Sequence, residues 1–134
     1  MTVVERIGSG GPWEQLYGYA RAVVAGDWIV TSGCTSTVDG VVVHKGDPYA
    51  QAKEAFRIGL DSIVAAGGAF ADVVRTRMYV TDPAFADAVG RAHGELFGLI
   101  RPAATLVVVG RLLDPDQLVE VELDAYRRRE SEDG

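Results

Sequence analysis

The sequence contains little of what most metal and disulfide centres are built from. Its 134 residues include one cysteine and two histidines. One cysteine excludes an intrachain disulfide framework and a cysteine-based zinc site. No cluster places three metal ligands at useful spacing, so we predict no metal centre. Chemistry in this chain must therefore rest on arginine, glutamate, tyrosine, hydroxyl groups and the backbone.

Long apolar runs and targeting signals are also absent. No stretch approaches about 18 uninterrupted apolar residues, so no segment is predicted to span a membrane. The first residues, Met1–Ile7, lack the basic start and the apolar run of a secretory signal. Together with the single free cysteine, this predicts a cytoplasmic protein.

Positive charge is in short supply. The chain has 13 basic and 19 acidic residues, a formal net charge of −6. Because nucleic-acid binding needs clustered lysine and arginine, this balance argues against such a partner. The length and the 48% hydrophobic content predict one globular domain. We assign residues 1–126 to that domain and the charge run at 127–134 to a flexible tail.

Two helices are predicted from matching start signals. An aspartate N-cap followed by proline opens each of them, at Asp47-Pro48 and at Asp82-Pro83. Apolar residues then recur at three- and four-residue spacing on one face. Glycine ends the helices, near Gly67 and at Gly98.

The remaining apolar runs predict strands, over residues 28–32, 38–41, 73–80, 104–109 and 119–126. Asp39-Gly40 is typical of a tight hairpin turn. In the last strand the apolar residues alternate with Glu120, Glu122 and Asp124, which places these carboxylates on one face. The order predicts an α+β fold, a mixed sheet with two helices on one face.

One predicted strand is too apolar to have a face in water. Leu106, Val107, Val108 and Val109 are apolar at successive positions. Self-association would bury the face of the sheet that the helices leave open. The sequence therefore predicts an oligomer.

Charged residues within or beside strands are the main candidates for a site. Arg75 and Arg77 point to one face, Arg101 precedes the most apolar strand, and Glu120 projects away from its apolar neighbours. One interpretation is an exposed sheet face covered with weak ion pairs. The other is a cleft in which arginine binds a ligand carboxylate and Glu120 activates water as a general base.

The cysteine and the histidines are weaker candidates. Cys34 follows a strand end with no histidine near it in sequence, and a nucleophilic thiol needs a base or a positive environment. His44 lies beyond the hairpin, and His93 is offset from the apolar stripe of the second helix. We interpret the cysteine as structural or incidental and both histidines as solvated or interface residues.

Several segments, in order, resemble the RidA/YjgF superfamily and together cover most of the chain, from about Tyr17 to Tyr126. They are Gly18-Tyr19-Ala20-Arg21-Ala22-Val23, Gly26-Asp27-Trp28-Ile29-Val30-Thr31-Ser32-Gly33, Ala66-Gly67-Gly68, the run 72–82, Arg101-Pro102-Ala103-Ala104-Thr105 and the run 118–125. The resemblance implies a fold like that of trimeric chorismate mutases and a homotrimer with clefts between subunits. It also implies cofactor-free hydrolysis of small reactive imines and enamines such as 2-aminoacrylate.

The resemblance assigns roles to particular residues. Glu120 would position the hydrolytic water, while Tyr19, Ser32 and Gly33 would line the cleft. The arginine that binds the substrate carboxylate in this family is replaced here by Ala104. The sequence therefore resembles the branch that lacks this arginine.

Other residues of the chain offer substitutes for the missing guanidinium. Arg101 lies on the same segment, Arg77 on a neighbouring strand and Arg21 near Tyr19. We predict substrate binding by Arg77, Arg101 and Thr105 in addition to the residues that line the cleft.

Two functions follow from this sequence. The first is an enzyme that hydrolyses small imines, enamines or related C–N metabolites, with a carboxylate ligand. The second is a trimer that binds a small molecule, without turnover, in a regulatory role. Ribonuclease activity is disfavoured by the acidic charge, and a chorismate-mutase-like role is permitted by the architecture but demanded by no residue.

Overall fold

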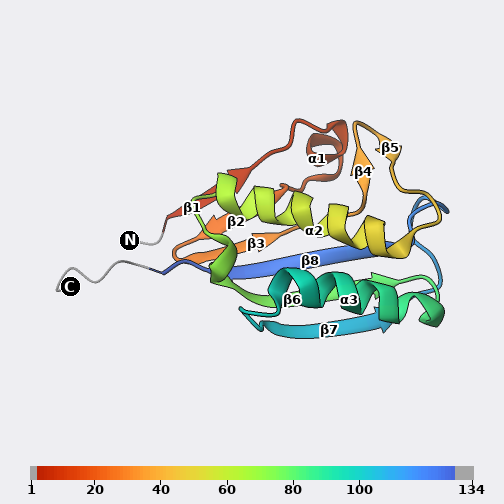
Figure 1. Ribbon diagram of the computed structural model, residues 1–134. Helices are drawn as coiled ribbons and strands as arrows, with labels where there is room; N and C mark the ends of the chain where they lie inside the picture. The colour runs from red at the N-terminus through yellow and green to blue at the C-terminus, as the bar shows by residue number, and fades with distance from the viewer. Residues whose placement is uncertain (1–2, 129–134) are drawn as a thin grey trace.

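The structure, a computed structural model that describes residues 3–128, contains one six-stranded mixed sheet (Figure 1). The strands lie in the order β1-β2-β3-β8-β6-β7, with β6 and β7 parallel and the other neighbours antiparallel. Their bounds are β1 Val4–Ile7, β2 Ala22–Ala25, β3 Trp28–Thr31, β6 Val73–Val80, β7 Ala103–Val108 and β8 Val119–Tyr126. The predicted mixed sheet is confirmed.

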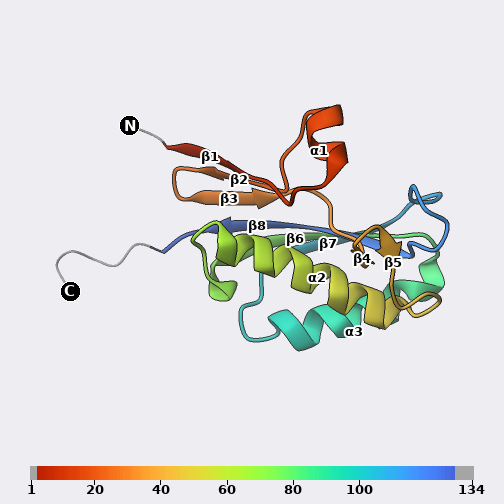
Figure 2. The same ribbon diagram turned by 90° about the horizontal axis from the view of Figure 1, so that it is seen from above.

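Both predicted helices are present and cover the same face of the sheet (Figure 2). Helix α2 spans Pro48–Ala65, and the Asp47 carboxylate accepts a hydrogen bond of 3.0 Å from the Ala50 N–H. This is the predicted N-cap. Gly67, with a φ of 93°, takes the left-handed conformation that ends the helical segment.

Helix α3 spans Ala86–Phe97 and begins later than the sequence predicts. The residues Pro83–Phe85 form a 3₁₀ turn instead, and Asp82 caps it by accepting a hydrogen bond of 2.8 Å from the Ala84 N–H. A tighter turn at the start of a helix is common, because the first N–H groups have no intrahelical partner. The aspartate therefore caps this turn rather than the α-helix.

The core lies between the sheet and the two helices. Phe56 from α2 and Phe97 from α3 pack edge to face there, and both are fully buried. In β8 the apolar residues of the predicted alternation are buried, whereas Glu120, Glu122 and Asp124 lie on the opposite face. The predicted division of this strand is confirmed, and it leaves one polar, uncovered face of the sheet. We call this the open face.

A separate hairpin joins β4 (Thr37–Val38) to β5 (Val41–Val42). Asp39 and Gly40 both have positive φ at its turn, 51° and 80°. This is the geometry that the Asp-Gly pair favours, so the predicted hairpin is confirmed.

Three elements at the start of the chain were missed by the sequence analysis: β1, the short helix α1 (Pro12–Tyr17) and β2. They are four to six residues long, too short for a periodic pattern to stand out. Figure 2 shows α1 on the side of the sheet opposite α2 and α3. Helix α1 therefore borders the open face.

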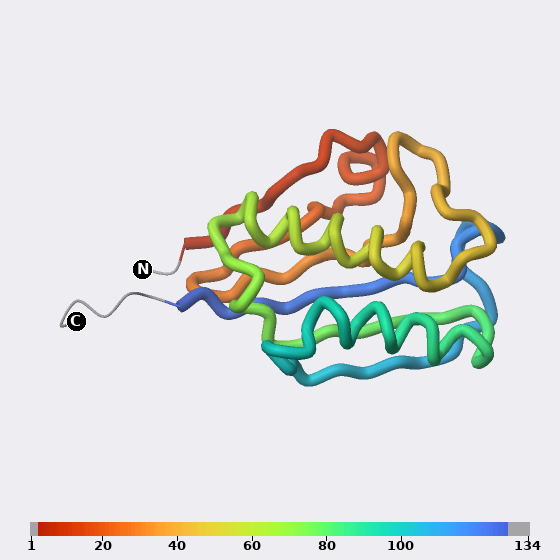
Figure 3. The backbone as a smooth tube through the Cα atoms, in the orientation of Figure 1, coloured from red at the N-terminus to blue at the C-terminus, as the bar shows by residue number. Residues whose placement is uncertain are grey.

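Both ends of the described chain are fastened at one turn of the sheet (Figure 3). The Gly26 N–H donates to the Val3 carbonyl oxygen, and the Arg127 N–H donates to the Asp27 carbonyl oxygen at 2.7 Å. Arg127 is the first residue of the predicted flexible tail. Residues 129–134 of that predicted tail lie outside the described residues.

Strand β7 forms one edge of the sheet and is exposed along most of its length. Val107 and Val108 point to opposite faces and are 41% and 51% exposed, which fits the prediction that neither face of this run suits water. Of the helices that the structure describes, none has the length and apolar character needed to cross a bilayer.

Candidate functional site

The open face carries a lattice of charged and polar groups. In the register of β6 with β8, Arg77 lies opposite Glu122 and Tyr79 lies opposite Glu120. The Arg77 Nη1 lies 3.2 Å from the Asp124 Oδ2, and the Tyr79 hydroxyl donates to the Glu122 carboxylate. Part of this face therefore matches the interpretation of an ion-paired surface.

The carboxylates of Glu122 and Asp124 accept hydrogen bonds, whereas the Glu120 carboxylate accepts none from the described residues. Its side chain is half-buried against Gly33. A Cβ built on Gly33 would lie 2.1 Å from the Glu120 Oε1, so a side chain at position 33 would displace this carboxylate from its present position. Burial raises the pKa of the Glu120 carboxyl, the neighbouring Glu122 raises it further, and the Arg21 guanidinium opposes both.

Arg21 reaches the same place from the residue before β2. Its Nη2 donates a hydrogen bond of 2.6 Å to the Gly33 carbonyl oxygen. Its Nε is buried and finds no hydrogen-bond partner among the described residues. The guanidinium is thus held beside Gly33 with donor capacity left over.

Ser32 connects these groups to the segment around Tyr19. The Ser32 Oγ donates to the Ala20 carbonyl oxygen at 2.6 Å, and the Ser32 N–H donates to the Arg21 carbonyl oxygen at 3.0 Å. Tyr19 and Ser32 line an open hollow of about 610 Å³ that α1 borders through Glu14 and Gln15. The structure therefore brings four of the predicted residues, Tyr19, Ser32, Gly33 and Glu120, to one region.

The loop after β7 contributes residues that the sequence analysis missed. Arg111, Leu112 and Leu113 line a hollow of about 480 Å³ together with Glu120. The Arg111 guanidinium donates to the carbonyl oxygens of Leu112 and Leu113 at 3.1 and 3.3 Å. A loop residue without a motif carries no signal of its own, so only the three-dimensional structure places Arg111 beside Glu120.

The other predicted binding residues lie elsewhere in the chain. Thr105 lies in the middle of β7, at the edge of the sheet, as the register partner of Arg77. Arg101 lies before β7, at the opposite end of β6 from the register partner of Glu120. At about 3.3 Å per residue this separates Arg101 from Glu120 by roughly 20 Å within one chain.

Ala104, the residue that replaces the family arginine, faces away from Glu120. Its register partner is Thr76, whose hydroxyl hydrogen-bonds the His93 ring on the helix side of the sheet at 2.7 Å. Side chains of register partners point to the same face. A residue at position 104 therefore projects from the helix-covered side at the edge of the sheet.

Cys34 and His93 lie in packed surroundings. The thiol of Cys34 is buried, which raises its pKa, and it donates to the Ser32 carbonyl oxygen at 3.4 Å. The His93 ring rests against Phe56 and Phe97, and burial lowers its pKa. His93 was predicted to be a solvated or interface residue, and the structure places its ring at the edge of the core.

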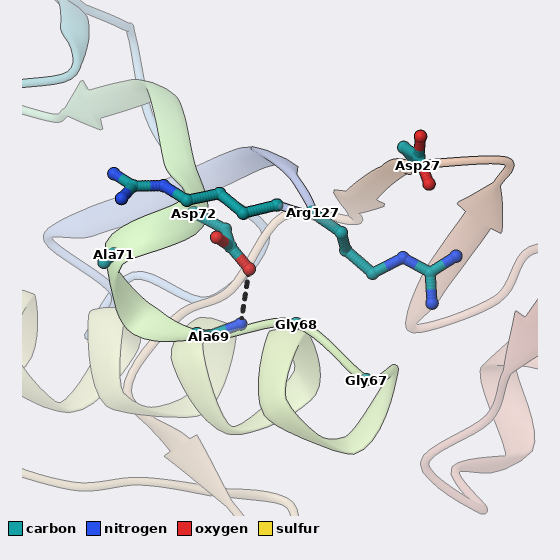
Figure 4. A pocket seen from close by; sticks show the side chains of 8 residues that line it. Asp27, Gly67, Gly68, Ala69, Ala71, Asp72 and Arg127 are labelled. Atoms are coloured by element: carbon teal, nitrogen blue, oxygen red, sulfur yellow. Dashed lines mark hydrogen bonds between the residues drawn. The ribbon is translucent and has the colours of Figure 1, made fainter. Parts of the chain in front are cut away.

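The hollow drawn in Figure 4 lies at the other end of β8. It encloses about 610 Å³ between Arg127, the Asp27 turn and the segment after α2, where the Asp72 carboxylate accepts a 2.8 Å hydrogen bond from the Ala69 N–H. Glu120 lies near the first residue of β8 and Arg127 follows its last, so roughly 20 Å separates them. None of the predicted site residues lines this hollow.

The fold and the surroundings of Glu120 define a class of protein: a small α+β scaffold whose open face holds a candidate site. A half-buried carboxylate and a guanidinium meet there at one glycine.

Comparison with known proteins narrows this class. The family model described as endoribonuclease L-PSP matches residues 13–127. An uncharacterized protein of Streptomyces coelicolor is 44% identical over 124 residues, which cover 92% of each chain. The chain therefore belongs to the endoribonuclease L-PSP family, to which the YjgF proteins are also assigned.

Solved structures agree with this assignment. A Mycobacterium tuberculosis protein described as a member of the YjgF/YER057c/UK114 family is 40% identical, with a TM-score of 0.83 over 92% of this chain and 99% of the other. The YjgF gene product of Escherichia coli is 28% identical, with a TM-score of 0.76 over 92% and 94% of the two chains. The resemblance to the RidA/YjgF superfamily and the predicted YjgF-type fold are confirmed.

Proposed function

We propose that this protein hydrolyses small imines and enamines that carry a carboxylate, with Glu120 as the group that activates water. The observation that carries this proposal is the half-buried Glu120 carboxylate, which touches Gly33 and has no hydrogen-bond partner among the described residues. A general base needs a free lone pair and a pKa close to the working pH. Burial moves the pKa of Glu120 in that direction.

The proposed reaction needs only water and a proton carrier. An enamine first tautomerises to the imine. Water then adds its oxygen to the imine carbon, while Glu120 accepts one proton of the water and the imine nitrogen takes one proton from solvent, which gives a carbinolamine. Glu120 returns its proton to the nitrogen of this adduct, the C–N bond breaks as the hydroxyl proton returns to solvent, and the products are a carbonyl compound and ammonia. The overall change is imine plus water to carbonyl plus ammonia.

We further propose that the site is completed by neighbouring copies of the chain in a homotrimer. Neither α2 nor α3 covers the open face, which carries exposed apolar residues, among them Trp28, Val30 and Val107. A second copy packed here would exclude water from these residues and would close the hollows at Tyr19 and Glu120. In such an assembly Arg101 of one copy could lie close to Glu120 of another.

A second candidate is a trimer that binds a small carboxylate without turning it over. The alanine at position 104 favours this alternative, because the family arginine that would hold the substrate is absent. RNA cleavage, the activity in the family's name, is disfavoured by the net charge of −6.

The test is turnover of freshly generated 2-aminoacrylate, measured as the rate of ketoacid release above the uncatalysed rate. We expect a rate for the wild type and a fall of about 100-fold or more for Glu120→Gln. Asp61→Asn, an exposed carboxylate on α2, is the matched control and should retain the full rate. No rate above background in the wild type would reject the enzyme and favour the binding protein.

A further inference from the structure

The arginines of the chain differ in their access to Glu120. Arg77 is already paired with Asp124, and Arg101 lies roughly 20 Å away in the same chain. The Arg111 guanidinium is turned back onto the carbonyl oxygens of its own loop. Arg21 is held next to Gly33, the residue that the Glu120 carboxylate touches.

The guanidinium of Arg21 makes few interactions within the described part of the chain. Among the described residues it makes one hydrogen bond, to the Gly33 carbonyl oxygen, and no ion pair within 4.0 Å. Its Nε is buried without a partner. An unsatisfied buried donor costs about 1–3 kcal/mol. The Nη1, which makes no hydrogen bond to the described residues and is not among the buried atoms, is the donor that a ligand can reach.

We infer that Arg21 holds the carboxylate of the ligand and so takes over the task of the arginine that Ala104 replaces. This inference rests on the proposed function, because it assigns the anchor of that same site. The guanidinium offers paired N–H donors, which suit a carboxylate, and unlike Arg111 it does not bind the carbonyl oxygens of its own loop. Anchor and base then come from one protomer.

The charge balance around Glu120 supports a cationic anchor at this place. Glu120 and Glu122 face the same region, and the Tyr79 hydroxyl is occupied by Glu122. These two carboxylates would repel a ligand carboxylate unless positive charge offsets them. Arg21 supplies that charge, as its opposing effect on the pKa of Glu120 indicates.

The geometry also places the proposed anchor close to the proposed base. Arg21 contacts the carbonyl oxygen of Gly33, and Glu120 lies against the Cα of the same residue. These two backbone atoms are only about 2.4 Å apart. A carboxylate held by Arg21 would therefore lie close to Glu120, so we expect ligands whose reacting carbon is near the carboxylate.

The test uses pyruvate, the ketoacid product of 2-aminoacrylate, and its uncharged analogue methyl pyruvate. Binding of both is measured by NMR titration of the wild type, Arg21→Gln and Arg21→Lys. We expect Arg21→Gln to bind pyruvate about 10- to 100-fold more weakly and to bind methyl pyruvate as the wild type does. Arg21→Lys keeps the charge but not the paired donors, so it should lose less.

The matched control is Arg91→Gln, which removes an exposed guanidinium on α3 and should leave pyruvate binding unchanged. Equal pyruvate binding by wild type and Arg21→Gln, equal loss of both compounds, or no pyruvate binding by the wild type would each overturn the inference. If Arg21→Gln does not fold, the same comparison is made with Arg21→Lys. Binding is measured without turnover, so the inference can stand where the enzyme fails. Turnover with an unchanged KM in Arg21→Gln would reject the anchor and keep the enzyme.

Discussion

The two faces of the sheet differ in the hydrogen bonding of their buried polar groups. On the helix-covered face Gln51 is fully buried, yet its side chain binds the His44 and Asp116 carbonyl oxygens and the Leu118 N–H. On the open face the Arg21 Nε is buried without a partner among the described residues. The Arg127 Nε, after the end of β8, is the other buried side-chain donor without a partner among the described residues. Buried polar groups are almost always satisfied, so such a donor is a candidate for a contact with a bound molecule. One face maintains the fold and the other is available for function.

The largest expected difference between the two faces is in stability, and it is tested by a substitution on the helix-covered face. Phe56→Ala removes a fully buried ring that packs against Phe97 and should lower the free energy of unfolding by about 3–5 kcal/mol. Chemical denaturation measures the loss. Val64→Ala, an exposed position on the same helix, is the control and should change it by less than about 0.5 kcal/mol. Similar losses in both variants would contradict the placement of the core.

A pair of glycine substitutions separates the two faces more finely. In Gly33→Ala the new Cβ displaces the movable Glu120 carboxylate, so turnover should fall about 100-fold with little change in stability. In Gly68→Ala the new Cβ lies 2.8 Å from Ile29 and 2.9 Å from Ile63, both fully buried. This overpacking should cost about 1–3 kcal/mol of stability.

Turnover per folded molecule should be unchanged in Gly68→Ala. Rates and melting curves of the two variants test the pair. A Gly33→Ala variant with wild-type turnover would show that the position of Glu120 is irrelevant to the reaction.

The smallest effect concerns the pH dependence of turnover. Glu120 acts as a base only when ionised, and its pKa is raised, so kcat/KM should fall as pH decreases through a value above the usual range of a glutamate. Glu122→Gln removes a carboxylate that raises this pKa and should move the fall to lower pH. Arg21→Gln removes the opposing charge and should move it to higher pH. Shifts in the same direction for both variants would contradict this electrostatic arrangement.

Local signals predicted much of the fold. The aspartates before proline at 47 and 82 do cap the turns that follow them, and the alternation in β8 separates its two faces as expected. These features depend on neighbouring residues alone. The short elements before Trp28 escaped notice because four to six residues do not establish a period.

The site was less accessible to sequence reasoning. The resemblance identified Gly33 and Glu120, and the structure shows that they touch. The positions of the arginines depend on the strand order, which places β3 between β2 and β8. No sequence motif indicates that the Arg21 side chain reaches Gly33, just after β3, or that Arg101 lies at the far end of β6. Long-range pairing decides which guanidinium is near the carboxylate.

The hydrogen bond from Arg21 to Gly33 has a consequence for mixed assemblies. Both residues and Glu120 belong to one polypeptide, so each copy carries its own anchor and base. Subunits defective at position 21 and subunits defective at position 120 would then not rescue one another when they co-assemble. In a cell that expresses both alleles, the two defects would therefore fail to complement, because no subunit carries both an intact anchor and an intact base.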